Sequence, residues 1–70
     1  MAESALAAIQ RQQIEIAVGE LLLTSDHYMR QSTIERIRHS IAHADATLDI
    51  TKFSEMALEE LQELDLLPRS

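Results

Sequence analysis

The residues with the clearest capacity for chemistry are two histidines spaced four apart. His39 and His43 fall in a segment of helical periodicity, with Glu35 one turn earlier. Residues four apart share one face of a helix, so two imidazoles and a carboxylate could together hold a zinc ion. Glu35 is also expected to cap a helix, and no HExxH pattern surrounds the pair. A solvated helix face is therefore the stronger interpretation, and we expect no metal and no cofactor.

A response to pH is a second chemical role for the histidines. His27, His39 and His43 lie close together in the sequence, and free imidazoles titrate near pH ~6.5. Protonation of all three would add positive charge to this segment. We hypothesise that acidification strengthens its contact with an acidic surface, although exposed pairs contribute only about 0–1 kcal/mol each.

Catalysis finds no support in the sequence. There is no cysteine, and no serine stands in a Gly-flanked nucleophile elbow. The acidic residues of the C-terminal third are spaced like a solvated helix face, and nothing in the pattern would raise their pKa values for acid–base work. We expect a protein that is not an enzyme and has no small-molecule substrate.

An aromatic ring, a thioether and a guanidinium stand side by side at Tyr28, Met29 and Arg30. Tyr and Arg are enriched at binding hot spots, whereas local packing over a helix corner is the alternative. We predict that this segment binds a partner together with Arg36 and Arg38. The three arginines are also the candidates for a local basic face that contacts DNA.

These residues must be positioned by helices. The 70 residues include one Gly, one Pro and 46% apolar residues, which favours one small all-α domain over a turn-rich β fold. The apolar periodicity predicts helices over residues 3–23, 33–44 and 48–65, followed by a loose tail over 66–70. Ser32 and Glu35 match a capping box, which places the second helix start at Thr33 after a loop. The predicted core positions are Ile14, Ala17, Val18, Leu21, Leu22, Ile34, Ile37, Ile41, Ala44, Ile50, Phe53, Ala57, Leu61 and Leu64.

The first predicted helix carries a second apolar stripe, at Leu6, Ile9, Ile16 and Leu23. Two apolar faces on one helix favour a homodimer whose interface includes Ile9, Ile16 and Leu23; one broad core face is the alternative. The only glycine, Gly19, lies in this helix, where it costs about 1 kcal/mol relative to alanine. Close approach of another helix would account for that cost, and a merely tolerant position is the alternative.

The charge is unevenly distributed. The formal net charge is −6, which opposes general nucleic-acid binding but leaves room for a local basic face. Residues 27–43 are mildly basic and residues 45–65 are strongly acidic. The sequence begins without a signal-peptide pattern, and no apolar run approaches the ~20 residues of a membrane span. We therefore expect a cytoplasmic protein without a membrane partner.

One stretch of the chain resembles a known family. The run Leu21-Leu22-Leu23-Thr24-Ser25-Asp26, a polar loop, Ile34, Ile37 and the run His39-Ser40-Ile41 are similar to the YmgB/AriR group of small enterobacterial regulators. The similarity extends from about Ile14 to Leu61 without gaps through the loop. The Ala/Gln-rich start and the acidic end from Glu59 to Ser70 depart from it.

The resemblance implies an all-helical homodimer that affects biofilm formation and acid resistance. Members of the group are described as connector proteins that feed signals into the Rcs phosphorelay through the response regulator RcsB. One member has been likened to Hha-type nucleoid modulators and credited with DNA binding, which makes a DNA-binding transcription modulator the alternative. A structural assembly or chaperone subunit would fit the acidic helical composition equally well without the family.

Overall fold

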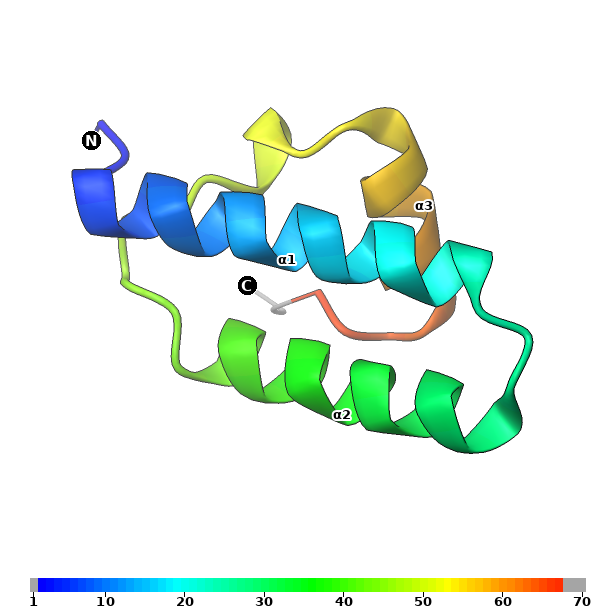
Figure 1. Cartoon of the computed structure of the whole chain (residues 1–70). Helices are drawn as coiled ribbons and strands as arrows, with labels where there is room; N and C mark the ends of the chain where they lie inside the picture. The colour runs from blue at the N-terminus through cyan, green and yellow to red at the C-terminus, as the bar shows by residue number, and fades with distance from the viewer. Residues whose placement is uncertain (1, 68–70) are drawn as a thin grey trace.

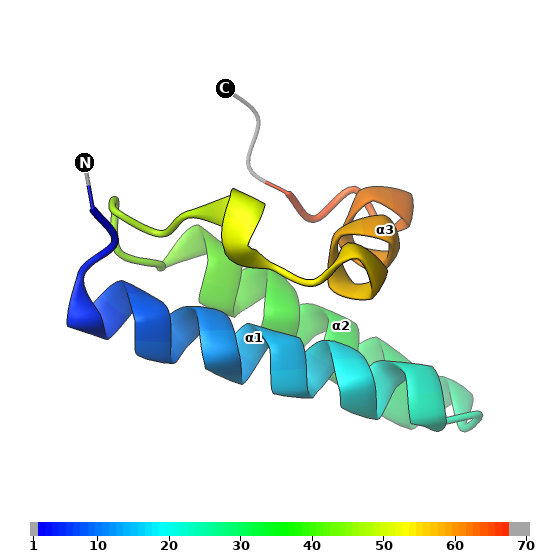
Figure 2. The ribbon, with the colours of Figure 1, turned by 90° about the horizontal axis from the view of Figure 1, so that it is seen from above.

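The computed structural model describes residues 2–67, which form helices α1 (Ala5–Leu23), α2 (His27–Ala42) and α3 (Glu55–Glu63) and the short 3-10 helix η1 (Ile50–Lys52). Helices α1 and α2 lie side by side and antiparallel (Figure 1). The segment with η1 and α3 covers one side of this pair and leaves the other side open (Figure 2). The prediction of an all-α domain of three helices is confirmed, and no strand occurs within the described residues.

The core lies between the α1/α2 pair and the covering segment. The largest fully buried side chains are Ile14, Val18, Leu21, Ile37 and Leu61, each at most 1% exposed. These residues come from the predicted stripes of all three helices, so the apolar periodicity identified the centre of the core. The prediction was wrong for Leu22, which is 41% exposed, and it missed the buried Ala7 and Leu66. The other predicted core positions that are only partly buried are Ile41, Ala44, Ile50 and Leu64.

The first helix begins close to its predicted start. Ser4 is the N-cap of α1, and its hydroxyl accepts a hydrogen bond from the backbone N–H of Ala7 at 3.0 Å. This contact satisfies one of the backbone donors that a helix start leaves without an internal partner. The glutamine-rich stretch from Gln10 to Gln13 continues the helix without a break.

Helix α2 starts six residues earlier than the sequence predicted. Asp26 is its N-cap, and the carboxylate accepts a hydrogen bond from the N–H of Met29 at 3.0 Å. Aspartate caps as well as serine, and no Gly or Pro follows to delay the helix, so the capping box predicted at Ser32 was wrong. The Tyr28 segment is consequently the first turn of α2 and not a loop.

The predicted third helix is divided into two elements. The Asp49 carboxylate caps η1 through the N–H of Thr51, and the Ser54 hydroxyl caps α3 through the N–H of Ala57. Between them Phe53 has an extended backbone, and its ring is buried. Polar side chains with short reach compete here for the backbone groups that a continuous helix would use. The prediction of one helix over residues 48–65 was therefore wrong.

The end of α3 forms a Schellman motif. Asp65 adopts a left-handed conformation with φ of 56°, and the N–H of Leu66 donates to the carbonyl of Leu61 at 2.9 Å. The turn directs Leu66 back into the core, where it is only 6% exposed. The predicted loose tail was thus wrong for residues 66 and 67, and its other residues lie outside the described part.

A set of polar contacts, called here the polar clamp, ties the start of α1 to the segment before η1. Its members are Glu3, Ser4, Asp45, Thr47 and Asp49. The Glu3 carboxylate accepts from the N–H of Asp49 at 3.0 Å and from Arg11 Nε at 3.1 Å, and its side chain is only 2% exposed. The N–H of Ser4 donates to Thr47 Oγ1 at 2.9 Å. These bonds join residues more than forty positions apart in the chain.

The polar clamp lowers the pKa of each of its three carboxyl groups. The N–H of Asp49 lowers the pKa of Glu3, with help from Arg11 and against the effect of burial. Hydrogen bonds from the hydroxyl and the N–H of Thr47 lower the pKa of Asp45, and those of Thr51 do the same for Asp49. In every case the hydrogen-bond donors favour the charged form of the acid, so the contacts of the clamp are strongest with ionised carboxylates.

Candidate interaction surface

The second stripe of α1 lies outside the core. Leu6 is 56% exposed, Ile9 53%, Ile16 64% and Leu23 90%. We call these four residues the α1 stripe. The expectation that they form a face separate from Ile14, Val18 and Leu21 therefore agrees with the burial of the side chains. An exposed row of large aliphatic side chains along one helix is typical of an interaction surface.

The α1 stripe follows a heptad rhythm. Including Gln13 and Glu20, its positions are spaced alternately by three and four residues, which is the a/d pattern of helices that pair. The apolar residues alone show one interval of three residues and two of seven, because the positions between them are polar. The two polar residues were not recognised as members of the surface, although their spacing was a readable signal.

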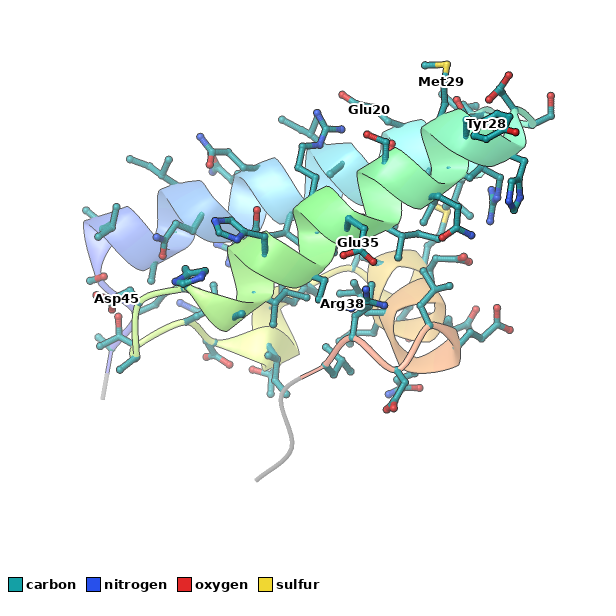
Figure 3. All side chains as sticks on the ribbon, turned by 90° about the horizontal axis from the view of Figure 1, so that it is seen from below. Glu20, Tyr28, Met29, Glu35, Arg38 and Asp45 are labelled. Atoms are coloured by element: carbon teal, nitrogen blue, oxygen red, sulfur yellow. The ribbon has the colours of Figure 1, made fainter. Side chains whose placement is uncertain are left out.

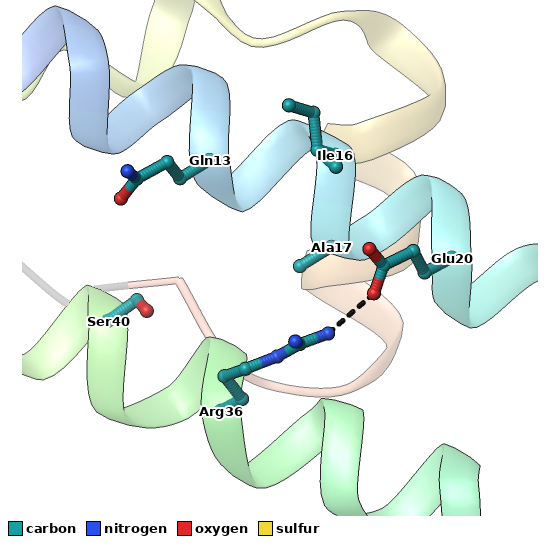
Figure 4. A pocket seen from close by; sticks show the side chains of 6 residues that line it. All are labelled: Gln13, Ile16, Ala17, Glu20, Arg36 and Ser40. Atoms are coloured by element: carbon teal, nitrogen blue, oxygen red, sulfur yellow. Dashed lines mark hydrogen bonds and ion pairs between the residues drawn. The ribbon is translucent and has the colours of Figure 1, made fainter.

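A shallow groove runs beside the α1 stripe between α1 and α2. It has a volume of about 270 Å³ and is lined by Gln13, Ile16, Ala17, Glu20, Arg36 and Ser40. Arg36 Nη2 bridges the groove to Glu20 Oε2 at 2.6 Å (Figure 4). Both side chains of this ion pair are more than half exposed, so the pair neutralises charge on the open side without being part of the core.

Gly19 has no close neighbour within its own chain. A Cβ atom built at this position would meet no atom within 4 Å. Packing inside the described residues therefore does not require a glycine here. The two interpretations that remain are approach by another molecule and a tolerant position.

The corner between α1 and α2 presents a second set of exposed apolar residues. Tyr28 is 84% exposed and Met29 61%, and both stand at the same end of the molecule in Figure 3. Arg30, the third residue of the predicted partner-binding segment, points instead to the end of α1. Its guanidinium donates to the carbonyl oxygens of Leu21 at 2.8 Å and Thr24 at 3.3 Å. Arg30 thus fixes the corner that displays Tyr28 and Met29.

The arginines of α2 do not form an open basic face. Arg36 pairs with Glu20, and Arg38 pairs with Glu35 on its own helix. Glu35 and Arg38 lie together midway along α2 in Figure 3, far from the corner. These carboxylates weaken the attraction of this surface for a phosphate backbone, because each of the two arginines already has an anionic neighbour.

The histidines are separated into two places. His39 and His43 are one turn apart at the end of α2, with ring centroids 4.3 Å from each other. His27 is at the other end of α2, where its ring meets Tyr28 edge-on at 5.8 Å. Glu35 is engaged by Arg38, and residues 2–67 contain no group of three His, Asp or Glu side chains suited to a metal ion.

None of the described helices combines the length and the apolar character that crossing a bilayer would need. A second hollow, also open and shallow, continues the groove beside the α1 stripe. It shares Glu20 and Arg36 with the groove and is otherwise lined by Met29, Ser32 and Thr33. The candidate surface is therefore the open side of the α1/α2 pair with its corner.

Comparison of the chain with family models, with curated proteins and with solved structures gives no match in any of the three.

Proposed function

We propose that the protein is a small non-enzymatic regulator of the cytoplasm that acts by protein–protein contact. The observation that carries the proposal is the concentration of exposed large apolar side chains on the open side and the corner of the α1/α2 pair. Burying such side chains is the main favourable term in association between proteins. The hollows found on this side are shallow, and none has the enclosed character of a small-molecule site.

The two surfaces have separate roles in this proposal. The α1 stripe joins two copies of the chain in a homodimer, with Ile9, Ile16 and Leu23 at the interface. The corner with Tyr28 and Met29 remains available to a second kind of protein. An aromatic ring and a flexible thioether held on a rigid helix start are suited to an apolar hollow on a partner.

The resemblance to the YmgB/AriR group suggests the nature of that partner. We propose a response regulator of the Rcs phosphorelay type, in a connector role related to biofilm formation and acid resistance. The DNA-binding alternative is less favoured by the surface charges, because Arg36 and Arg38 each pair with a carboxylate and Arg30 is occupied by the corner carbonyls.

The experiment measures binding of the purified protein to an Rcs-type response regulator by calorimetry. Replacement of Tyr28→Ala together with Met29→Ala should weaken binding by about tenfold or more, as expected for hot-spot side chains. Met56→Ala is the matched control, since Met56 is as exposed as Met29 but lies on α3. Binding that is absent in the wild type, or equally tight in the double variant, would overturn the proposed role of the corner.

A further inference from the structure

We propose that a second copy of the chain binds to the open side of the α1/α2 pair, with its α1 antiparallel to the first α1. The two-fold axis of this dimer passes between Gln13 and Ile16. This inference rests on the homodimer of the proposed function and adds its orientation. In a dimer of this kind each surface patch is used twice, once by each copy.

The order of residues along the α1 stripe suits an antiparallel pair. Its N-terminal half contains Leu6 and Ile9, and its C-terminal half ends with Leu23, the most exposed large apolar residue of the described chain at 90%. Antiparallel packing places Leu23 of each copy against the Leu6–Ile9 half of the other. Ile16 lies near the axis and meets the middle of the same helix in the second copy.

The charge at Glu20 distinguishes antiparallel from parallel packing. Glu20 occupies an a/d position between Ile16 and Leu23, and a parallel pair would place the two Glu20 carboxylates side by side. An antiparallel pair about this axis instead separates the two carboxylates and places each beside Ile9 of the other copy, about one helical turn from Gln12 and Gln13, whose side-chain amides can donate hydrogen bonds. The helix dipoles are also opposed in this arrangement, which is favourable.

The rest of the open side is compatible with a second helix. Arg36 already neutralises Glu20 within each chain, so approach of the second copy does not leave an isolated carboxylate at the interface. The groove of about 270 Å³ beside Ile16 can receive side chains from the second α1. Gly19 lacks the Cβ atom that would keep two helix backbones apart, and a Cβ built there would meet no atom of the described packing within 4 Å.

A membrane surface is a poorer occupant than a second copy, because the a/d positions along the α1 stripe include Glu20 and no lysine or arginine.

The first step of the test measures mass by light scattering over a range of concentrations. The wild type should be a dimer, and Ile16→Asp should shift it to a folded monomer with unchanged helical circular dichroism. Met56→Asp is the matched control, because Met56 is 61% exposed against 64% for Ile16 but lies away from the α1 stripe. It should leave the dimer intact.

The second step determines the orientation by cysteine cross-linking. No native thiol interferes, because the sequence has no cysteine. Ile9→Cys, Ile16→Cys and Leu23→Cys variants are treated with a short bis-maleimide. Positions 9 and 23 are about 21 Å apart along one helix, so the reagent does not join them within a chain. We expect a doubling of mass with Ile16→Cys alone and with a mixture of the Ile9→Cys and Leu23→Cys proteins. Neither of the latter proteins should cross-link alone.

The outcomes separate the two levels of the proposal. Cross-linking of Ile9→Cys with itself, and not with Leu23→Cys, would establish a parallel dimer and overturn the inferred orientation while keeping the homodimer. A monomeric wild type would overturn both, without affecting the response-regulator measurement at the corner. Glu59→Cys on the exposed side of α3 is the control for random collision, and equal cross-linking there would also contradict the interface.

Discussion

Two regions of helix α1 differ in how many of their contacts are made within the chain. They are the polar clamp at the start of the helix and the α1 stripe along its open side. At its start, the polar clamp gives nearly every polar group a partner, and the Glu3 side chain is almost completely covered. Along its open side, the α1 stripe leaves four large aliphatic side chains more than half exposed. The long-range polar contacts at the start of α1 are thus made within the chain, whereas the apolar side chains of the α1 stripe are left uncovered by it.

The largest expected effect comes from two leucines of α1 only two residues apart. Leu21 is fully buried and Leu23 is 90% exposed. Leu21→Ala should lower the free energy of unfolding by about 2–5 kcal/mol, because it removes buried contacts and leaves a cavity. Leu23→Ala should leave the unfolding of the monomer nearly unchanged and should instead weaken self-association.

Urea denaturation followed by circular dichroism at several protein concentrations measures both quantities. Concentration dependence of the midpoint reports dimerisation, and its value at high dilution reports the monomer. If Leu23→Ala destabilised the diluted monomer as strongly as Leu21→Ala, the distinction between core face and α1 stripe would be lost.

A smaller effect is expected within the polar clamp. Ser4→Ala should lower the free energy of unfolding by about 1 kcal/mol, because it removes the N-cap of α1 and the hydrogen bond to Asp45. Asp26→Ala is a control of the same type, since Asp26 caps α2 on the exposed corner without any long-range partner. A greater loss for Ser4→Ala than for Asp26→Ala would show that the clamp acts beyond helix capping, and equal losses would contradict this.

The smallest effect, spread over several groups, is a dependence of stability on pH. Glu3, Asp45 and Asp49 have pKa values below their ordinary 4.5, 3.8 and 3.8. Their charged forms stabilise the folded chain above these ordinary values, and the stabilisation is lost as pH falls through the lowered pKa values. The urea midpoint should therefore decline once the pH drops below about 4.5.

Glu3→Gln tests the origin of that decline, because it removes one of the titrating groups and keeps the shape of the side chain. Its urea midpoint should depend less steeply on acid pH than that of the wild type. An unchanged slope would show that the carboxyl groups of the clamp are not responsible.

The contrast between the clamp and the α1 stripe also explains what could be predicted from the sequence. Apolar periodicity is a local property, so it identified Ile14, Leu21 and Ile37 as core residues and separated Ile16 from them. Contacts such as that between the N–H of Ser4 and Thr47 join residues that only the fold brings together. No spacing rule indicates them in advance.

The start of α2 and the division of the third predicted helix were missed for a different reason. Asp26 and Ser32 are both good capping residues, and the choice between them depends on the cost of leaving His27 to Gln31 without helical hydrogen bonds. The division at Phe53 likewise depends on the gain from placing its ring in the core, which is a tertiary effect. The turn of the chain at Asp65 was not predicted, because aspartate adopts a left-handed conformation much less often than glycine.

The braced corner has a consequence for the order of events in folding. Only Thr24, Ser25 and Asp26 separate α1 from α2, and Arg30 anchors the joint with bonds to carbonyls at most nine positions earlier in the chain. Contacts between neighbours in sequence form quickly, because closing a short loop loses little chain entropy. The α1/α2 hairpin is thus expected to form first. Its apolar open side is then exposed before the residues from η1 onward have packed against the hairpin. Two such hairpins are then expected to associate through the α1 stripe before either chain has finished folding.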